Sequence, residues 1–261
     1  MTLVTTSIDP RGVATVTLNR ADKHNALDAP TIRALHEGLL RVGSDERVRV
    51  VVLTGAGASF CAGADIAHMR SMMNATEDQN VEDALLLARC LQTLDELERP
   101  VIARVNGNVF GGGLGLVSCA DIAIGAAEAK FALTEVRLGI VPAVISPYVV
   151  PAIGPRAARR LFLTAAPFDA AEAQKLGLLH EVAAAEELDA RVEAQIELIL
   201  RGGPRALTAA KKLVRTVVSS QDRESLRLET ARLLASLRVT PEGREGLSAF
   251  LECRKPSWQR D

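Results

Sequence analysis

The sequence predicts an α/β fold followed by a helical C-terminal region, and three observations lead to this prediction. Short apolar runs alternate with stretches of helical periodicity over the first half of the chain. Val48 to Leu53 is a valine-rich run of the kind found in strands that are buried on both faces. Beyond about Pro142 the strand signals fade and helical patterns dominate. The alternation indicates parallel βαβ units joined by right-handed crossovers.

The N-terminal segment is expected to form a β-hairpin and then a helix. Leu3 to Ile8 and Val13 to Leu18 alternate apolar and polar side chains around the turn sequence Asp9-Pro10-Arg11-Gly12. Asp28-Ala29-Pro30 is typical of a helix start. An apolar stripe at helical spacing follows it and consists of Ile32, Leu35, Leu39 and Val42.

The middle of the chain continues the alternation. Asp65 is the expected N-cap of a helix from Ile66 to Met73. A longer helix, with an apolar stripe of Leu87, Leu91 and Leu94, ends before Pro100. A strand from Val101 to Val105 then leads into a glycine-dense turn. After that turn we expect a helix from Leu114 to Ala120 and a strand from Asp121 to Ile124.

The last part of the chain contains amphipathic helical patterns and no internal repeat. The patterns lie at Leu188 to Ile199, Ala206 to Val218, Leu226 to Leu237 and Leu247 to Leu251. This region is too small and too amphipathic to fold alone, so we expect it to pack on the first part or on another subunit. We therefore divide the chain into a core, residues 1–195, and a helical C-terminal region, residues 196–261.

Composition excludes several classes of protein. The 261 residues are 48% hydrophobic, which supports a large core. A net charge of −1 provides no general attraction to nucleic acid or to anionic membranes. There is no apolar run long enough to span a bilayer, and no targeting signal at either end, so we expect a cytoplasmic protein. The four cysteines show no metal or redox spacing; we expect them to be reduced and predict no metal site.

The most informative segment is the glycine-dense turn Asn106-Gly107-Asn108-Val109-Phe110-Gly111-Gly112-Gly113-Leu114-Gly115. Glycines let the backbone approach a ligand closely, and a helix start presents N–H groups that lack partners. An oxygen that gains negative charge would be stabilised at such a place. Glu135 follows in an apolar segment, where burial would raise the pKa of its carboxyl group. The pair suits proton chemistry beside a carbonyl group.

A second N–H donor is expected from the small-residue segment Phe60 to Ile66. One interpretation of this segment is a tight turn capped by Asp65 and nothing more. The functional interpretation is that the Ala64 N–H faces the donor of the glycine turn. An oxyanion hole needs two donors, commonly from different parts of the chain, so the two segments together are more specific than either alone. By contrast, Gly55 and Gly57 lack the rest of a dinucleotide-binding motif, and we do not expect nicotinamide binding.

Several charged residues allow two interpretations. Lys23 and His24 are either a solvated surface pair or a phosphate contact. Glu135 is either an acid–base residue or a surface charge paired with Arg137. The basic cluster Lys211, Lys212 and Arg215 is either a solvated helix face or an RNA-binding patch, and the first interpretation is favoured.

Taken together, these motifs resemble the crotonase family, also called the enoyl-CoA hydratase/isomerase superfamily, over nearly the whole chain. The resemblance begins at Leu18-Asn19-Arg20 and Asn25-Ala26-Leu27 and includes Phe60 to Ile66 and Pro100 to Gly115. It continues through Cys119-Ala120-Asp121 and Thr134 to Gly139. Its last motifs are Leu163-Thr164, Ala173-Gln174, Gly177-Leu178 and Ala249-Phe250-Leu251.

The resemblance implies a crotonase-like spiral of ββα units with a helical C-terminal trimerisation region, in a homotrimer or a dimer of trimers. It implies an acyl-CoA thioester as substrate, with coenzyme A present only as part of that substrate and no separate cofactor. Glu135 would be catalytic, and the N–H groups of Ala64 and Gly112 would hold the thioester oxygen. The residues implied in substrate and coenzyme A binding are Lys23, His24, Ala26, Ala62, Asp65, Ile66, Gly111, Pro142 and Phe250.

The chain departs from the family pattern at three places. Hydratases with two glutamates carry one of them where this chain has Gly115, so only Glu135 remains. The usual glycine-rich run after Pro142 is replaced by Ala143 to Ser146, which should reshape the acyl pocket. Near the C-terminus a lysine that often contacts coenzyme A is replaced by Cys253, and the neighbouring Arg254 is a candidate substitute.

The motif text is closest to bacterial methylglutaconyl-CoA hydratases. The leading hypothesis is therefore reversible hydration of a branched enoyl-CoA of the 3-methylglutaconyl type, with water held by Glu135 and by backbone or Ser146 groups. Candidate cations for a distal carboxylate are His68, Arg70 and Arg137. The alternatives are a double-bond isomerase that uses the same single glutamate, and a noncatalytic or RNA-binding member of the family.

Overall fold

Two sheets form the framework of the protein, whose residues 2–259 are described by a computed structural model. The larger sheet has the strand order β1-β2-β3-β5-β7-β10. β1 and β2 form the predicted antiparallel hairpin, and all later neighbours run parallel. The strands are β1 (Val4–Ile8), β2 (Val13–Leu18), β3 (Val50–Gly55), β5 (Val101–Val105), β7 (Ile122–Ala126) and β10 (Glu181–Ala183).

The smaller sheet has the order β4-β6-β8-β9. Its strands are β4 (Ser59–Cys61), β6 (Asn108–Phe110), β8 (Lys130–Ala132) and β9 (Phe168–Asp169). The first three pair in parallel, and β9 is antiparallel to β8. Each of β3, β5 and β7 is followed by a strand of the smaller sheet and then by helical structure, so the predicted spiral of ββα units is confirmed.

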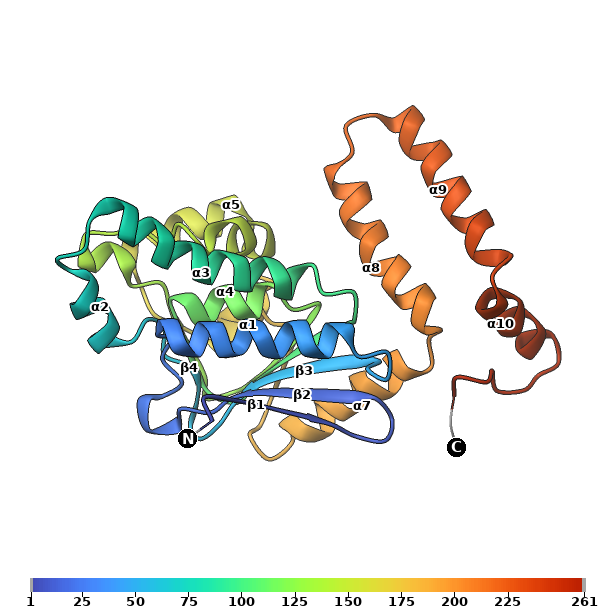
Figure 1. Ribbon diagram of the computed structural model, residues 1–261, viewed down its shortest axis with the longest axis horizontal. Helices are drawn as coiled ribbons and strands as arrows, with labels where there is room; N and C mark the ends of the chain where they lie inside the picture. The colour runs from blue at the N-terminus through green and yellow to red at the C-terminus, as the bar shows by residue number, and fades with distance from the viewer. Residues whose placement is uncertain (1, 260–261) are drawn as a thin grey trace.

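Helices cover both faces of the larger sheet (Figure 1). One face carries α1 (Ala29–Ser44), α3 (Glu77–Asp95), α4 (Gly112–Ser118) and α5 (Ser146–Thr164). Two shorter helices, α2 (Ile66–Met72) and α6 (Ala170–Lys175), follow the strands β4 and β9. The other face is covered by α7 (Leu188–Leu200), whose Leu188, Val192 and Ile196 are buried against valines and isoleucines of the sheet. This two-sided burial is the reason why the parallel strands are almost wholly apolar.

The last three helices, α8 (Pro204–Ser219), α9 (Arg223–Arg238) and α10 (Pro241–Leu251), form an arm that projects from the core (Figure 1). Neither α8 nor α9 contains a buried residue, whereas α7 does. The boundary expected between residues 195 and 196 lies inside α7, and the projecting part begins at Pro204. In the part of the chain that the structure describes, no helix is both long and apolar enough to cross a membrane.

The structure differs from the predicted elements in a few short segments. Ser59–Cys61 and Asn108–Phe110, which were expected to be turns, are strands β4 and β6. Both are only three residues long, and such segments carry too little periodicity to be distinguished from turns. α4 begins at Gly112, two residues before the expected start at Leu114, because glycines conceal a helix start in the sequence.

Candidate active site

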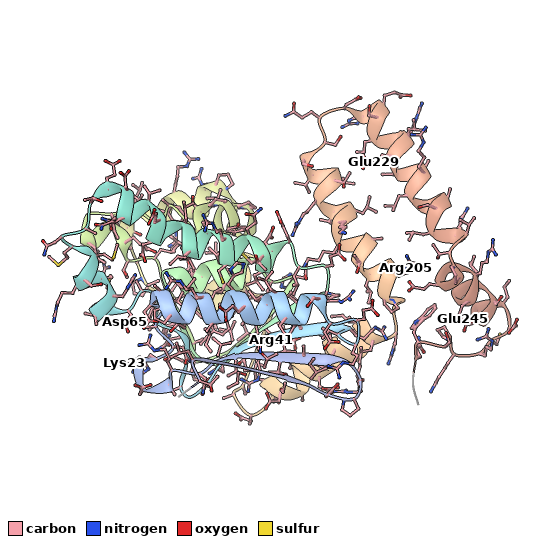
Figure 2. All side chains as sticks on the ribbon, in the orientation of Figure 1. Lys23, Arg41, Asp65, Arg205, Glu229 and Glu245 are labelled. Atoms are coloured by element: carbon pink, nitrogen blue, oxygen red, sulfur yellow. The ribbon has the colours of Figure 1, made fainter. Side chains whose placement is uncertain are left out.

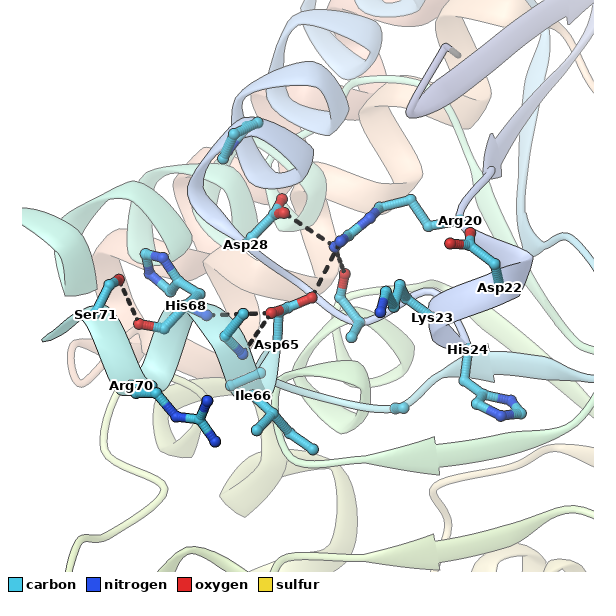
Figure 3. Close-up of a pocket in the computed structure, with 15 residues that line it drawn as sticks. Arg20, Asp22, Lys23, His24, Asp28, Asp65, Ile66, His68, Arg70 and Ser71 are labelled. Atoms are coloured by element: carbon cyan, nitrogen blue, oxygen red, sulfur yellow. Dashed lines mark hydrogen bonds and ion pairs between the residues drawn. The ribbon is translucent and has the colours of Figure 1, made fainter. Parts of the chain in front are cut away.

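A pocket of about 720 Å³ opens at the end of the core opposite the arm, between the loop before α1 and the loop before α2 (Figures 2 and 3). It brings together most of the residues that the resemblance implied in coenzyme A binding. Those that line it are Lys23, His24, Ala26, Ala62, Asp65 and Ile66, and Ala64, the predicted oxyanion-hole donor, lines it too. Gly111, Gly112, Glu135, Pro142 and Phe250 are outside this lining.

The two loops are joined by a short backbone ladder. The N–H of Ala62 donates to the carbonyl of His24 (2.9 Å), that of Leu27 to Gly63 (2.7 Å), and that of Asp65 to Leu27 (2.9 Å). Leu27 and Ala64 thus form a parallel bridge in which the Ala64 N–H is not used. No described residue accepts this N–H, so the ladder leaves one donor available at the pocket.

Asp65 serves the local fold through its side chain. Its Oδ1 accepts from the N–H groups of Ala67 (2.8 Å) and His68 (3.1 Å), which confirms the predicted N-cap of α2. Its Oδ2 accepts from Arg20 (3.0 Å). The hydrogen bond from His68, with help from Arg20 and Ala67, lowers the pKa of this carboxyl group against the opposing effect of burial. Both carboxylate oxygens thus have hydrogen-bond partners within the protein.

The glycine turn lies next to the loop of residues 62–65. Gly111 adopts φ +47° and ψ −118°, a conformation that favours glycine, and α4 begins immediately after it. A Cβ built on Gly111 would lie 3.3 Å from Oε1 of Glu135 and 3.8 Å from Cα of Gly63. The Gly112 N–H, at the first position of the helix, has no acceptor among the described residues. The 62–65 loop, the glycine turn and Glu135 therefore converge.

Glu135 begins the short 3₁₀ helix η2 (Glu135–Leu138) and is partly buried. Its Oε2 is buried and has no hydrogen-bond partner within the described part of the chain. Burial raises the pKa of the carboxyl group. Arg137 does not pair with it and instead donates to the carbonyl of Ala165 (2.9 Å). A carboxyl group held in this way is suited to exchange a proton with a ligand rather than to stabilise an ion pair.

The surroundings of Glu135 differ from the expectation in one respect. The apolar segment around Glu135 was expected to be buried, but Leu138, Ile140 and Val141 in this segment are 61%, 56% and 65% exposed. The reason is that η2 ends at Gly139 in a left-handed conformation, after which the chain runs along the surface. The close approach of the glycine turn on the other side of Glu135 is the contact that shields its carboxyl group.

Gly115 stands where the resemblance places a second glutamate in other hydratases, and apolar side chains fill the space beside it. A Cβ built on Gly115 would lie 2.6 Å from Cγ2 of Ile145 and 3.3 Å from Cδ1 of Leu91. Ile145 is buried, and it belongs to the segment that replaces the usual glycine-rich run. Gly115 and Ile145 are thus packed closely together, and a larger residue at position 115 would need the space that Ile145 occupies.

The other candidate residues are distributed as follows. His68 is held by Asp83 (2.9 Å), and Ser146 donates to the carbonyl of Ala143 (2.7 Å). Arg70 lines the pocket and makes no ion pair with a described acidic residue (Figure 3). Cys61 is buried, which raises the pKa of its thiol to about 12 and makes it unreactive.

Two residues near the C-terminus do not reach the pocket of the same chain. Phe250 lies on α10, in the arm, and is 80% exposed. Arg254 is the candidate substitute for the family lysine that Cys253 replaces in this chain. It forms a bidentate ion pair with Glu245 (2.7 and 2.9 Å). Within one chain, Arg254 thus binds an acidic residue of the arm itself. Pro142 is buried in the loop between η2 and α5.

The three clustered basic residues on α8 form ion pairs with the core, and only Lys211 among them is largely shielded from solvent. Lys211 pairs with Asp121 (2.7 Å), Arg215 with Asp95 (3.0 Å), and Lys212 with Glu98. Each of the three bases that could have formed an RNA-binding patch is thus neutralised by an acidic residue of the core. The sequence interpretation as an ordinary helix face is closer to the structure, although that face binds the protein itself.

Sequence reasoning assigned no role to two residues that organise the pocket. Asn25 is wholly buried in a left-handed conformation (φ +57°), and its side chain donates to the carbonyls of Ala56 (2.9 Å) and Ser59 (2.8 Å). Arg20 joins Asp28 and Asp65. Asparagine tolerates the left-handed region better than most residues, which is a weak signal in the sequence. The role of Arg20 depends on contacts distant in the chain.

Comparison with known proteins agrees with this geometry. The sequence profile of the family described as enoyl-CoA hydratase/isomerase matches residues 9–261. A crotonyl-CoA hydratase from Syntrophomonas wolfei is 34% identical over 248 residues, which cover 94% of each chain. The crystal structure of an enoyl-CoA hydratase/isomerase from Legionella pneumophila is 40% identical, covers 99% of this chain and 100% of its own, and superposes with a TM-score of 0.94. AtuE from Pseudomonas aeruginosa is 38% identical with the same coverage and a TM-score of 0.95.

These matches cover nearly the whole length of this chain, and the three relatives are likewise covered over nearly their whole length. They include the two-sheet spiral, the glycine turn and the C-terminal helices. The chain therefore belongs to the enoyl-CoA hydratase/isomerase family, the crotonases.

Proposed function

We propose that this protein adds water reversibly to the double bond of an enoyl-CoA thioester. The observation that carries the proposal is the convergence of two backbone N–H groups without acceptors, those of Ala64 and Gly112, with the carboxyl group of Glu135, whose buried Oε2 has no hydrogen-bond partner among the described residues. A related protein named crotonyl-CoA hydratase supports the same reaction class. Such an arrangement stabilises negative charge on one atom while a proton moves at a neighbouring one.

The pocket would hold the coenzyme A part of the substrate. Ala62, Asp65 and Ile66 would contact the adenine, and the segment from Lys23 to Ala26 would lie near the phosphates. Lys23, which lines the pocket, would be the cation near these phosphate groups. The acyl group would then extend past Ala64 towards the glycine turn and Glu135.

In the reaction, the Glu135 carboxylate takes a proton from water while the water oxygen bonds to the β-carbon. The π electrons of the double bond move to the thioester oxygen, which becomes an enolate oxygen between the N–H groups of Ala64 and Gly112. Each such donor contributes about 3 kcal/mol to the transition state. The protonated Glu135 then delivers its proton to the α-carbon, and the thioester carbonyl re-forms. One carboxyl group performs both transfers because Ile145 occupies the space beside Gly115.

For the acyl group, we propose a branched enoyl chain with a distal carboxylate, of the 3-methylglutaconyl type. Of the three candidate cations, His68 is paired with Asp83 and Arg137 donates to a backbone carbonyl. Arg70 has no ion-pair partner among the described residues, so it is the candidate cation to which we assign the distal carboxylate.

The test is a panel of unsaturated acyl-CoAs incubated in heavy-oxygen water and analysed by mass. The proposal expects a product with the mass of substrate plus one heavy water. Acyl-CoAs with a second carboxylate should be preferred over those with a neutral acyl group. Arg70→Met should remove this preference. Arg41→Met, in the last turn of α1, is the control and should keep it. Equal rates with both substrate classes would contradict the assignment of Arg70.

A double-bond isomerase is the second candidate, favoured by the single carboxyl group beside the glycine turn. In that reaction Glu135 would move a proton between carbons, and the product would keep the mass of the substrate without oxygen incorporation. The same panel distinguishes the two reactions. An RNA-binding function is disfavoured because Lys211, Lys212 and Arg215 are paired with acidic residues of the core; salt-dependent RNA binding in a shift assay would revive it.

We also propose that the arm contacts further copies of the chain, in a trimer or a dimer of trimers. Large apolar side chains are exposed along it, including Val214, Val218, Leu234 and Phe250. A patch of this kind commonly marks a protein interface. Sedimentation of the wild type and of a Val218→Asp/Leu234→Asp variant tests this proposal. A wild type that sediments as a monomer would contradict it.

A further inference from the structure

Arg20 binds the backbone of the pocket at a specific carbonyl group. Its Nη1 donates to the carbonyl of Ala26 at 2.7 Å (Figure 3). Its Nη2 donates to Asp65 at 3.0 Å, and Nη1 lies 3.1 Å from Asp28. The Arg20 side chain is only 14% exposed. A charge that is so shielded acts strongly on the groups it touches, because little solvent screens it.

The carbonyl of Ala26 and the N–H of Leu27 belong to one peptide group. Peptide groups are planar and trans, so these two atoms point in opposite directions. The Leu27 N–H donates to the carbonyl of Gly63 at 2.7 Å. The peptide group that contains this carbonyl also contains the N–H of Ala64, which points away from Leu27 for the same reason.

Arg20 therefore starts a chain of hydrogen bonds that ends at the Ala64 N–H. The order is the guanidinium, the Ala26–Leu27 peptide, the Gly63–Ala64 peptide, and then the available N–H donor. All dipoles in this chain point in the same sense. A cation at the carbonyl end withdraws electron density from each peptide in turn, and hydrogen bonds aligned in series strengthen one another.

We propose that Arg20 is a positioning residue that orients and polarises the Ala64 N–H through two successive peptide groups. This inference rests on the proposed function, since it makes Arg20 a remote part of the oxyanion hole. The two carboxylates beside Arg20 complete the arrangement. Asp28 accepts from the Thr31 N–H (2.8 Å), and Asp65 accepts from the N–H groups of Ala67 and His68. The two carboxylates thus cap α1 and α2, and Arg20 forms an ion pair with each of them.

The test uses the full-length protein with the variants Arg20→Met and Arg20→Lys. Arg20→Met removes the charge, and we expect kcat to fall roughly tenfold or more, because small losses of donor alignment have large effects on rate. Arg20→Lys keeps a charge that can reach the Ala26 carbonyl, and we expect it to recover at least part of this loss. Arg47→Met is the matched control, since Arg47 is 78% exposed and pairs with Asp45 away from the pocket.

The decisive readout is the absorption of a conjugated, chromophoric enoyl-CoA bound to the protein. Polarisation of the thioester carbonyl by the two donors should shift this absorption to the red, and Arg20→Met should reduce the shift. Free coenzyme A has no thioester oxygen, so its Kd measures separately how far the variant disturbs the pocket itself. A merely structural role would instead weaken coenzyme A binding and kcat together and leave the red shift of the remaining bound ligand unchanged.

Should Arg20→Met fail to fold, Asp28→Asn provides the same test. This change removes a carboxylate that opposes the field of Arg20 while the amide oxygen keeps the helix cap. The red shift should then be as large as in the wild type or larger, and a smaller shift would overturn the inference. A wild type that binds the chromophoric thioester without any red shift would contradict the proposed function itself, whereas a red shift that persists in Arg20→Met contradicts only the role of Arg20.

Discussion

The helices α7 and α8 follow each other in the chain, yet they differ in what their apolar faces contact. Leu188, Val192 and Ile196 of α7 are buried against the larger sheet. The apolar stripe of α8 includes Val214 and Val218, which are 64% and 82% exposed. Amphipathic periodicity therefore predicts that a segment is helical, but it does not predict whether the protein itself supplies the surface that covers it.

The core and the arm also differ in the interactions that stabilise them. The core is stabilised by a continuous apolar cluster that extends from Val4 to Leu179. The arm is attached by charges, with Lys211 and Arg215 of α8 paired to Asp121 and Asp95 of the core. We therefore expect substitutions in the core to change activity or stability strongly, and substitutions at the arm to have smaller effects that depend on salt.

The largest effect is expected at the catalytic end of the core. Glu135→Gln keeps the shape of the side chain but cannot move a proton, and kcat should fall by roughly 10² to 10⁴. Steady-state kinetics checks this, with Glu128→Gln, an exposed residue between β7 and β8, as the control. Undiminished activity in Glu135→Gln would remove the proposed mechanism.

The next effect concerns packing between α4 and the segment before α5. Gly115→Ala should destabilise the protein by about 1–3 kcal/mol, because the added Cβ would lie 2.6 Å from Cγ2 of Ile145. In an Ile145→Ala background that atom is absent, so the added cost of Gly115→Ala should largely disappear. Urea unfolding of the four proteins in this double-mutant cycle measures the coupling. Additive effects would show that the two positions do not compete for space.

At the arm, two neighbouring lysines should differ. Lys211 is 12% exposed and pairs with Asp121, so Lys211→Met should cost about 1–2 kcal/mol and loosen the attachment of α8. Lys212 is 60% exposed and pairs with Glu98, and Lys212→Met should cost about 0.5 kcal/mol or less. Limited proteolysis between α7 and α8 measures the loosening. Equal cleavage of both variants would contradict the buried-pair argument.

The smallest effect is a dependence of stability on pH. Burial raises the pKa of Glu135 in the folded protein above its ordinary value of 4.5. Its contribution to stability is therefore fully present below the unfolded pKa and is lost as the pH rises through the folded pKa. Glu135→Gln should be more stable than the wild type at neutral pH, by at most about 1 kcal/mol because the carboxyl is partly exposed, and the difference should vanish near pH 4. Urea midpoints of both proteins across this range provide the measurement, and a difference that grows towards low pH would reverse the assigned direction.

Much of the fold could be predicted from the sequence, because its long elements carry strong local signals. The hairpin of β1 and β2, the cap of α1 at Asp28 and the stripe of α3 all lie where the sequence placed them. The short strands β4 and β6 could not be predicted. Their pairing depends on neighbours far along the chain rather than on their own few residues.

The prediction of the candidate site shows the same division. The residues from Lys23 to Ala26 and from Ala62 to Ile66 line one pocket, as the resemblance implied. The role of Arg20 and the exposure of Phe250 were not visible in the sequence. The role of Arg20 depends on contacts with residues distant in the chain, and the exposure of Phe250 depends on the absence of such contacts in the described structure.

By itself, the sequence determined the type and order of the main helices and strands, the glycine turn and the single carboxyl group that follows it. It could do so because turn chemistry, helix caps and apolar periodicity act over only a few residues. Only the tertiary structure decided that Ile145 fills the space beside Gly115, and that the Ala26–Leu27 and Gly63–Ala64 peptides align in series behind one arginine. Such contacts join residues that are far apart in the chain, so they exist only after the spiral has closed.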